Sequence, residues 1–307
     1  MLPHQTDISV VMATFNGERY LRQQLDSILL QTVSPKEIII VDDGSTDTTL
    51  AILKEYATDD RFRLLVNDYN VGYIRSFEKG MLQATCPYIA LSDQDDIWLP
   101  HKLETLASNI EDHIAVYSDS MLVDKNGMSL NKKMSDLKNQ LTYNNCLMYT
   151  IGAWAPGHAM LFRKALVDQC KPFPALVTHD FWLGFVASCN GGIFYVNEVL
   201  VHYRQHASNA IGANTQQSKK QKPTRAEKIL TAQRRMQLLY EKCPEGLTEQ
   251  KEVLRLLSET YQRSDLKSRW KRMICFFRYR NIFLAYKKKS VLMQILFCVK
   301  MFFKIDA

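Results

Sequence analysis

Short apolar runs alternate with helical patterns through the N-terminal third of the chain, and this alternation restricts the possible folds more than any other feature of the sequence. The runs at 8–13 and 37–41 are rich in β-branched residues, and those at 62–66 and 88–91 are also apolar, so all four predict buried strands. Between them, apolar residues recur at three- and four-residue spacing, as in helices. Strands that alternate with helices build βαβ units. We therefore expect an α/β fold with a mostly parallel central sheet flanked by helices.

Polar side chains stand where three of these predicted strands end. They are Thr14 and Asn16 after the first strand, Asp42 and Asp43 after the second, and Asp93, Asp95 and Asp96 after the fourth. Ligands of open α/β sheets bind beyond the carboxyl ends of the strands. We therefore expect these three polar groups to form one shared site.

The acidic group after the fourth strand is the most distinctive of the three. Asp93, Asp95 and Asp96 place three carboxylates within four residues, and crowded carboxylates raise each other's pKa unless a cation or hydrogen-bond donors compensate. Mg²⁺ or Mn²⁺ bound to a diphosphate is a natural partner, because these ions prefer carboxylate and phosphate oxygens. The alternative is a solvated acidic turn that caps the next helix.

The chain beyond residue 115 alternates less regularly. Predicted strands lie at 115–119, 157–162, 193–196 and 199–203, and predicted helices at 163–170, 181–186, 224–242 and 248–263. The polar segment 124–143 is predicted to be a mobile loop and the segment 213–223 a linker. We expect a first domain over 1–212, with halves at about 1–120 and 121–212, followed by a helical extension over 224–307.

Composition and missing motifs exclude several classes of protein. Hydrophobic residues make up 46% of the 307 residues, which is typical of a globular chain with a full core. The seven cysteines are dispersed without a CxxC pair, so we expect reduced thiols in a cytosolic protein rather than disulfides or a zinc site. We expect no secretory signal, because no basic region followed by an apolar stretch opens the sequence. The loop at 14–18 lacks the glycine patterns of dehydrogenases and of P-loop nucleotide hydrolases.

The net charge of +7 is concentrated near the C-terminus. Residues 263–307 contain twelve Lys or Arg and two Asp or Glu, a balance of +10, whereas the remainder carries about −3. Bulky apolar residues are interleaved with these charges, and the longest uncharged run, 290–299, has ten residues, about half of what spans a bilayer. The pattern is typical of a helix lying on an anionic membrane surface. The alternative is a helix packed on the protein with a solvated basic face. We expect no nucleic-acid partner, because no nucleic-acid-binding motif accompanies the charge.

Taken together, the motifs resemble glycosyltransferase family 2, whose members are inverting enzymes with the Rossmann-like GT-A fold. The resemblance rests on the segments 10–17, 40–47, 70–72 and 93–96, in this order, and covers roughly residues 7 to 212. The segments 92–98, 179–183 and 203–206 are similar to those of bacterial rhamnosyltransferases of surface-polysaccharide synthesis. The resemblance implies metal-dependent transfer of a sugar. L-rhamnose from dTDP-rhamnose is the best match, and a UDP-sugar is the alternative donor.

The resemblance also implies a role for each matching residue. Nucleotide-sugar contacts would come from Thr14, Asn16, Asp42, Asp43, Asn70, Asp93 and Arg204. Asp95, the second acid of the family's DxD motif, and His206 are expected to bind Mg²⁺ or Mn²⁺. Asp180 matches the catalytic base that would take a proton from the acceptor hydroxyl, with His179 where the family more often has Glu. The expected acceptor contacts are Trp154, His158 and His179.

Simpler roles remain open for several of these residues. Asp42 and Asp43 also suit turn chemistry, Asp180 can cap the helix that follows it, and Arg204 can form a surface salt bridge. A catalytically inactive, membrane-associated scaffold of the same fold is the alternative to an enzyme. If the chain is an enzyme, the expected acceptor is a growing, lipid-linked polysaccharide. The protein would then be cytoplasmic and peripheral on the inner face of the cytoplasmic membrane.

Overall fold

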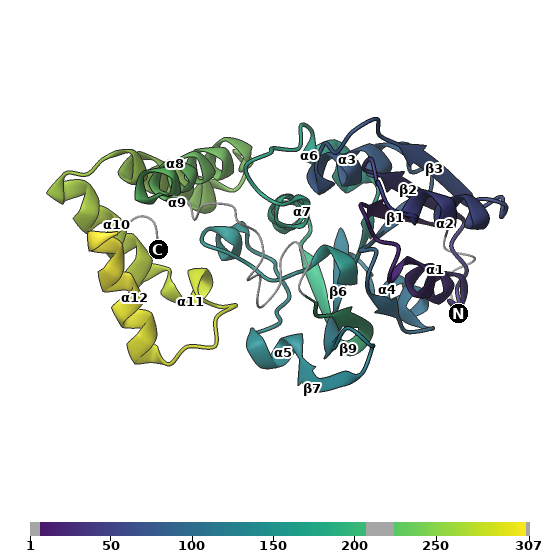
Figure 1. Ribbon diagram of the computed structural model, residues 1–307. Helices are drawn as coiled ribbons and strands as arrows, with labels where there is room; N and C mark the ends of the chain where they lie inside the picture. The colour runs from purple at the N-terminus through teal and green to yellow at the C-terminus, as the bar shows by residue number, and fades with distance from the viewer. Residues whose placement is uncertain (1–6, 207–223, 305–307) are drawn as a thin grey trace.

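A nine-stranded sheet forms the centre of the computed structural model, which describes residues 7–206 and 224–304 (Figure 1). The strand order across the sheet is β3-β2-β1-β4-β8-β6-β9-β5, and β7 pairs with β6 beside this path. Helices flank the sheet, so the predicted α/β class is confirmed.

The N-terminal part of the sheet is parallel, as the alternating pattern predicts. Its strands are β1 (Ile8–Thr14), β2 (Glu37–Asp42), β3 (Phe62–Val66) and β4 (Tyr88–Ser92). The connecting helices are α1 (Leu21–Leu29), α2 (Thr49–Tyr56) and α3 (Tyr73–Gln83). Thr14 pairs with Asp42 and Met12 pairs with Ser92, so the carboxyl ends of β1, β2 and β4 lie at one edge of the sheet.

The second part of the sheet is mixed. Its strands are β5 (Ile97–Trp98), β6 (Ala115–Val123), β7 (Ser129–Lys133), β8 (Met160–Arg163) and β9 (Ile193–Arg204). Helices α4 (Lys102–Asn109), α5 (Met134–Leu137), α6 (Ala165–Cys170) and α7 (His179–Cys189) and the short 3₁₀ helices η1 (Cys146–Tyr149) and η2 (Gly157–Ala159) connect them. Strand β8 runs antiparallel to β4 and β6, whereas β9 runs parallel to β6.

Two predictions for this second part are wrong. The segments 193–196 and 199–203 belong to one strand, β9, because shifts in register around Asp119 do not interrupt its pairing with β6. The segment 124–143 is not a loop throughout, since it contains β7 and α5. All five residues of β7 are exposed, and an exposed strand of polar residues has no apolar alternation by which to recognise it.

Two apolar cores cover the two faces of the sheet, because successive residues of a strand point to opposite sides. Val10 and Met12 of β1 join a core that includes buried side chains of α1, α2 and α4. Val11 joins the other core, which includes α3 and α7. The polar edge formed by the ends of β1, β2 and β4 is therefore held by packing on both sides.

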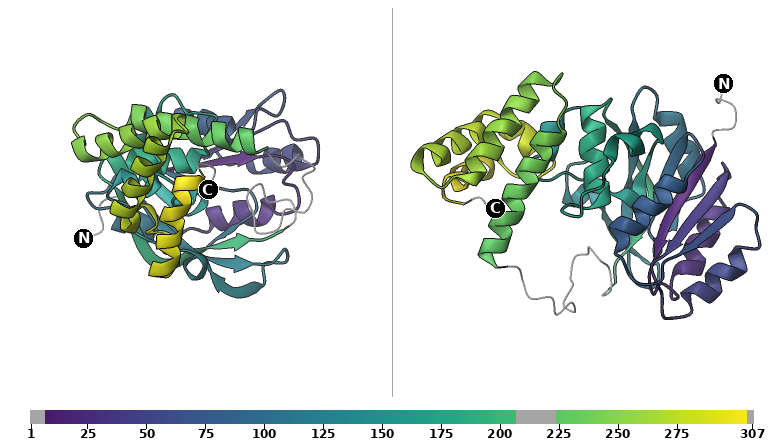
Figure 2. Two further views of the ribbon diagram at one scale, coloured as in Figure 1. Left: turned by 90° about the vertical axis from the view of Figure 1, so that its left-hand side faces the viewer. Right: turned by 90° about the horizontal axis from the view of Figure 1, so that it is seen from above.

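The C-terminal extension is a group of helices at one end of the molecule (Figures 1 and 2). They are α8 (Arg225–Lys242), α9 (Thr248–Gln262), α10 (Leu266–Arg278), α11 (Arg280–Phe283) and α12 (Val291–Phe303). The buried Met236, Leu257 and Phe276 belong to the same core as α3 and α7, so the extension packs on the sheet domain. The predicted linker at 213–223 lies outside the described residues.

Helices α10 and α12 pack against each other and leave an apolar outer face. The buried Arg272 joins them, because its guanidinium donates to the carbonyl oxygens of Met301 at 2.8 Å and Thr260 at 2.6 Å. We define the α10/α12 face by its exposed apolar residues: Leu266, Trp270, Ile274, Val291, Leu292, Met293, Ile295, Leu296, Val299 and Phe303. In the described ranges, 7–206 and 224–304, we find no helix with the length and apolar character needed to span a bilayer.

Candidate active site

The polar groups at the strand ends meet in the structure, as the sequence predicts. Thr14 at the end of β1 donates its hydroxyl to Asp42 Oδ2 at 3.0 Å. Gln94, from the acidic loop after β4, accepts from the Phe15 N–H at 2.9 Å and donates to the Phe15 carbonyl at 3.1 Å. Gly17 leaves space for this bridge, since a Cβ there would lie 2.3 Å from Gln94 Oε1. The loops after β1, β2 and β4 therefore form one continuous polar edge.

Asp42 and Asp43 are buried and organise this edge. Asp42 accepts from the Ser45 N–H at 3.0 Å and from the Ser45 hydroxyl at 2.6 Å. Asp43 accepts from the Val71 N–H at 2.9 Å and so anchors the loop on which Asn70 is exposed. Both carboxylates thus perform the turn chemistry that was the simpler interpretation, and any nucleotide contact would add to it.

Asn16 fastens the first loop to the second. Its backbone has a left-handed conformation, with φ at +47°, which asparagine adopts more readily than most residues. Its Oδ1 accepts from the Thr46 N–H at 2.8 Å, and its own N–H donates to Ser45 Oγ at 2.9 Å. The side chain of Asn16 therefore holds the polar edge together.

The acidic loop after β4 gathers more ligand atoms than its own carboxylates. His158, on η2, lies beside it because β8 runs antiparallel to β4 and starts where β4 ends. Its Nδ1 is 3.8 Å from Asp93 Oδ2 and 4.0 Å from Asp96 Oδ2. Asp93, Asp96 and His158 each offer a ligand atom, and these atoms lie within 4.8 Å of one another.

This group of three residues suits a hard divalent cation. Asp96 Oδ2 is buried, and no described residue gives it a hydrogen bond. Burial and then the charge of Lys102 lower the pKa of His158 to about 3, so the ring is neutral at ordinary pH. A neutral ring that donates from Nε2 to Ser120 Oγ, 3.0 Å away, would direct its Nδ1 lone pair at the carboxylates. Carboxylate oxygens with one imidazole are donors that Mn²⁺ and Mg²⁺ accept.

We define the acidic cluster as Asp93, Asp95 and Asp96. The negative charges of its carboxylates repel one another. Burial first, and then the charges of Asp95 and Asp180, raise the pKa of Asp93. Burial and the neighbouring charges of Asp95 and Asp93 raise the pKa of Asp96 well above its ordinary value. Lys102, buried beneath the cluster, donates to the His158 carbonyl at 2.6 Å and opposes both shifts. A cation bound here would relieve the remaining repulsion.

The structure brings the two expected metal ligands together. His206 Nε2 lies 2.8 Å from Asp95 Oδ2, and both side chains are largely buried. The His206 ring also contacts the Tyr20 ring, with centroids 4.9 Å apart. Asp95 and His206 therefore offer further possible metal ligands beside Asp93, Asp96 and His158.

Arg204 is buried and supports the acidic loop. The residue is 1% exposed. Its backbone N–H donates to Asp96 Oδ1 at 3.0 Å and its Nε to the Asp95 carbonyl at 2.8 Å. The two terminal nitrogens donate to Gln23 Oε1 at 2.6 Å and to the Lys125 carbonyl at 3.1 Å. The burial of Arg204 excludes the surface salt bridge, and its contacts make it a positioning residue for the acidic loop; its expected contact with the nucleotide sugar stays a prediction.

Asp180 lies in the first turn of α7, at the same edge as the acidic cluster. Thr178 is the N-cap of this helix and donates its hydroxyl to Asp180 Oδ1, which also accepts from the Phe181 N–H at 2.7 Å. Gly157 of η2 lies against this turn, since a Cβ there would lie 3.2 Å from His179 Nε2 and 3.4 Å from the Asp180 Cβ. The Asp180 carboxylate is thus oriented through one oxygen beside the cluster.

The other two residues expected to contact the acceptor, His179 and Trp154, are buried or partly buried. His179 is 6% exposed, and its ring stacks on Phe77 with centroids 4.1 Å apart. Neither of its ring nitrogens has a hydrogen-bond partner among the described residues, and burial lowers its pKa. The buried ring of His179 therefore suits a structural role, in which it packs beneath Asp180 and supports it. Trp154 is partly buried, and its backbone N–H donates to the Tyr143 hydroxyl at 2.9 Å, so its expected contact with the acceptor stays a prediction.

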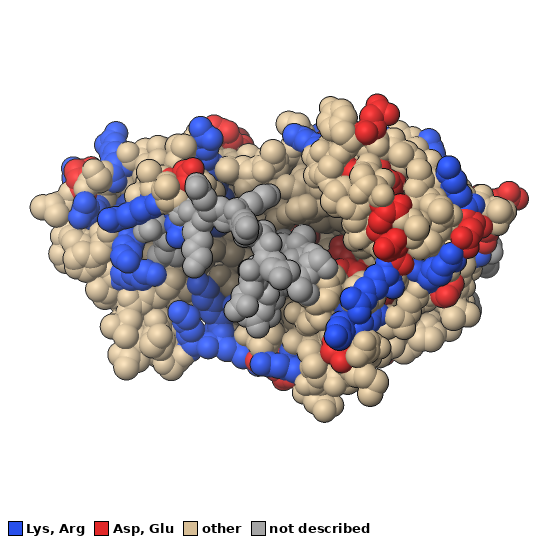
Figure 3. Space-filling view, in the orientation of Figure 1, with Lys and Arg blue, Asp and Glu red and all other residues tan. Residues whose placement is uncertain are grey.

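The surface of the protein carries a hollow between its two parts. Figure 3 shows this hollow between the sheet domain and the extension, with acidic side chains along the sheet-domain side.

The fold and site match known glycosyltransferases. The Glycosyl transferase family 2 model matches residues 9–169. An uncharacterized glycosyltransferase of Haemophilus influenzae is 30% identical over 238 residues, which cover 72% of this chain and 73% of that protein. The UDP-Glc:alpha-D-GlcNAc-diphosphoundecaprenol beta-1,3-glucosyltransferase WfgD of Escherichia coli is 26% identical over 216 residues, or 70% of this chain and 83% of that protein. The chain belongs to glycosyltransferase family 2, and it is an enzyme that takes a sugar from a nucleotide-sugar donor.

Solved structures show the same fold. The S. aureus TarS 1–349 structure in complex with UDP-GlcNAc has a TM-score of 0.59 at 18% identity and covers 90% of this chain and 81% of that chain. A second TarS structure, in complex with UDP, has a TM-score of 0.57. The predicted GT-A fold is confirmed by this likeness.

Proposed function

We propose that the protein is an inverting, divalent-metal-dependent transferase that moves a sugar from a nucleoside diphosphate to a lipid-linked saccharide. One observation carries the proposal: η2 places His158 beside Asp93, with Nδ1 3.8 Å from Oδ2, and its neighbour Gly157 against Asp180, where a Cβ on Gly157 would lie 3.4 Å from the Asp180 Cβ. The acidic cluster suits the diphosphate end of a donor, and Asp180 suits an acceptor hydroxyl. Their proximity matches a single displacement, which inverts the configuration at the sugar carbon.

Asp180 is the proposed catalytic base. Its Oδ1 already accepts hydrogen bonds from Thr178 and from the Phe181 N–H, so Oδ2 would take the acceptor's proton. The buried ring of His179 supports the helix turn that presents this carboxylate. Because the acceptor oxygen attacks the sugar directly, no covalent enzyme intermediate is required.

Asp95 and His206, together with Asp93, Asp96 and His158, would hold Mg²⁺ or Mn²⁺. The bound cation would supply charge compensation for the departing diphosphate. Lys102 and Arg204 keep the ligands in place from below, through the His158 carbonyl and the Asp95 carbonyl respectively. The residues Thr14, Asn16, Asp42, Asp43 and Asn70 at the polar edge would receive the nucleoside.

Two nucleotide sugars are candidates for the donor. Our sequence-based choice is dTDP-rhamnose. The WfgD relative is named for UDP-Glc, and the TarS structure contains UDP-GlcNAc, so these names favour a UDP-sugar as the second candidate. Titration calorimetry with UDP and dTDP in Mn²⁺ tests the proposed nucleotide edge: tighter binding of one nucleotide selects the donor class. Absence of binding by both would refute the edge as a nucleotide site.

The α10/α12 face is the proposed contact with an anionic membrane, which would place the enzyme beside a lipid-linked acceptor at the inner face of the cytoplasmic membrane. Its apolar side chains are flanked by the exposed Lys267, Lys271, Lys288, Lys289, Lys300 and Lys304. A basic rim around an apolar surface matches the interface of an anionic leaflet. In Figure 2 (left panel), α12 lies on the side of the extension that is turned away from the sheet domain.

We expect the double variant Leu292→Gln/Leu296→Gln to bind anionic vesicles about tenfold more weakly than the unchanged protein, because both side chains would lose their apolar contact with the lipid. These leucines are 65% and 53% exposed, so their replacement should leave the fold intact. Co-sedimentation with vesicles at low and high salt measures the effect. Leu30→Gln, a change of a 72% exposed leucine on the sheet domain, is the control. Equal sedimentation of the double variant and the control would contradict membrane contact through this face.

We expect the stabilisation by Mn²⁺ to increase with pH. The raised pKa values of Asp93 and Asp96 mean that the metal-free folded protein binds these protons more tightly than the unfolded chain, whose Asp pKa is about 3.9. Their contribution to stability is therefore present below about pH 4 and is lost as the pH rises through the folded pKa values. A bound cation compensates the charges of Asp93 and Asp96 and so removes this loss of stability. The rise in Tm with Mn²⁺ should therefore be larger at about pH 7 than at about pH 5.

Thermal melting with Mn²⁺ and with EDTA at both pH values measures this difference. Asp96→Asn should reduce it, because the amide removes one of the raised titrations, whereas the exposed Asp60→Asn should not. A Mn²⁺ effect independent of pH would contradict metal binding at the acidic cluster.

A further inference from the structure

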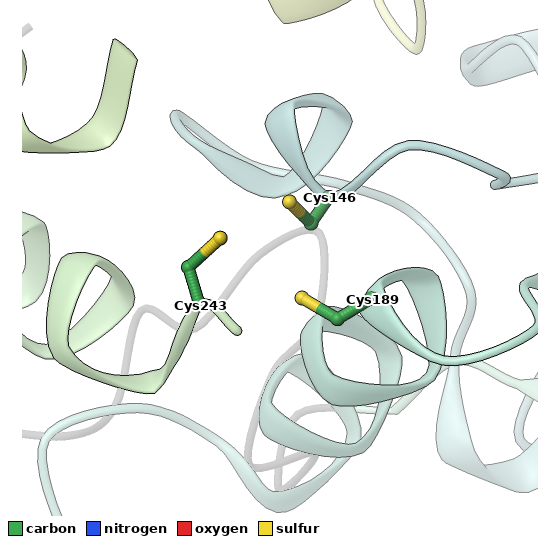
Figure 4. Close-up of side chains that lie close together, drawn as sticks. All are labelled: Cys146, Cys189 and Cys243. Carbon is green, nitrogen blue, oxygen red and sulfur yellow. The ribbon is translucent and has the colours of Figure 1, made fainter. Parts of the chain in front are cut away.

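Three cysteines that are far apart in the sequence point their sulfur atoms at one another (Figure 4). Cys146 is the first residue of η1, Cys189 is the last residue of α7, and Cys243 is the C-cap of α8. Their sulfur atoms lie within 4.8 Å of one another. The three cysteines are dispersed in the sequence, but the fold brings them together; our expectation of reduced thiols without a metal site stays a prediction.

We propose that Cys146, Cys189 and Cys243 bind a soft, thiophilic metal ion, Zn²⁺ or Cu⁺, that joins the extension to the sheet domain. Thiolates are the preferred ligands of both ions. Three sulfurs around Zn²⁺, each at about 2.3 Å, leave a fourth position for water, and three around Cu⁺ complete a trigonal site. This inference does not depend on the proposed function.

The exposure of the three residues fits such a site. Cys146 is fully buried and Cys243 is 2% exposed, so protein shields two of the sulfurs from solvent. Cys189 is only partly buried, which leaves a path for the ion and for a water ligand. Among the described residues, the remaining cysteines, Cys86, Cys170, Cys275 and Cys298, join no comparable group.

Lys251 places a positive charge beside the cluster. Hydrogen bonds with Cys146 and Cys189 lower the pKa of Cys243, and the charge of Lys251 acts in the same direction against burial. The Lys251 Nζ donates to the Cys243 carbonyl at 2.7 Å, which holds that charge beside the site. Hydrogen bonds with Cys146 and Cys243, and then burial, raise the pKa of Cys189. A bound metal ion would displace the thiol protons of the cluster.

The position of the cluster defines its role. Asp180 and Cys189 stand near opposite ends of α7, nine residues apart, which corresponds to about 14 Å along the helix. The ion would therefore be remote from the reacting groups. It would tie η1, the end of α7 and the end of α8 at the junction with the extension, so that it braces the helix whose first turn carries the proposed base.

Metal analysis tests the site directly. The full-length protein, purified under reducing conditions without chelators, should contain about one Zn²⁺ or Cu⁺ per chain by mass spectrometry of the metals, and the result distinguishes the two ions. Cys243→Ala should lose that ion. Cys170→Ala, which changes another fully buried cysteine outside the cluster, should retain it. If Cys243→Ala does not fold, Cys189→Ala at the partly exposed position serves instead.

Thermal melting provides the second readout. After removal of metals, saturating Zn²⁺ or Cu⁺ should raise the Tm by about 5 °C in the unchanged protein and in Cys170→Ala. The cluster variant should lose this rise and retain the rise caused by Mn²⁺, which separates the cysteine site from the acidic cluster. A protein that contains neither ion and whose Tm responds to neither would overturn the proposal. A disulfide between two of the three cysteines, detected in a non-reduced digest, would overturn it as well.

Discussion

Asp180→Asn should slow sugar transfer by roughly 10²–10⁴-fold, the usual effect of removing a general base. An Asn side chain can keep the oxygen that accepts from Thr178 and from the Phe181 N–H, so the turn at the start of α7 should persist. Its amide nitrogen cannot accept the acceptor's proton. Because Asp180 lies beside the acidic cluster rather than at the nucleoside edge, UDP or dTDP should bind as tightly as before.

The measurement is a comparison of the turnover rate with the nucleotide Kd. Asp168→Asn is a matched control, because Asp168 is an exposed carboxylate on the neighbouring helix α6. It should change neither quantity. Loss of nucleotide binding together with turnover in Asp180→Asn would show that Asp180 maintains the fold of the site rather than accepting a proton.

Asp95→Ala should reduce transfer by at least about 10²-fold, because metal-ion charge stabilisation is worth several kcal/mol and each 1.4 kcal/mol is tenfold in rate. The change removes the carboxylate that lies 2.8 Å from His206 Nε2, which is a proposed metal ligand. It also removes a charge that raises the pKa values of Asp93 and Asp96, so the metal-free protein should remain folded.

Two measurements separate the metal role of Asp95 from a structural one. The variant should melt no lower than the unchanged protein in EDTA, but it should lose most of the stabilisation by Mn²⁺. Asp60→Ala, at an exposed position outside the site, should behave like the unchanged protein in both assays. Full activity of Asp95→Ala would be incompatible with the proposed ligand set.

The parallel part of the fold could be predicted because its signals are local. Each strand and helix there carries its own periodicity, and the parallel order places the ends of β1, β2 and β4 at one edge. The same reasoning fails for β7, whose residues are all exposed, and for β9, whose pairing continues through the register shifts beside β6. Those elements depend on contacts with distant strands.

The site could be predicted in part for the same reason. The acids after β4 are adjacent in the sequence, whereas Asp93 and His158 meet only because β8 is antiparallel to β4. The predicted strand at 157–162 was a usable signal, since an antiparallel partner of β4 would place His158 at the same edge. The burial of Arg204 and the meeting of the three cysteines had no comparable local signal.

The central claim is that the polar edge and the acidic cluster release a nucleoside diphosphate in a metal-dependent reaction. Measurement of UDP and dTDP release from a panel of UDP-sugars and dTDP-rhamnose, in Mn²⁺ and in EDTA, tests it most directly. The structure predicts release from at least one donor in Mn²⁺ and its loss both in EDTA and in Asp95→Ala. Equal release in Mn²⁺ and EDTA, or no release from any donor in the presence of a saccharide acceptor, would contradict the claim.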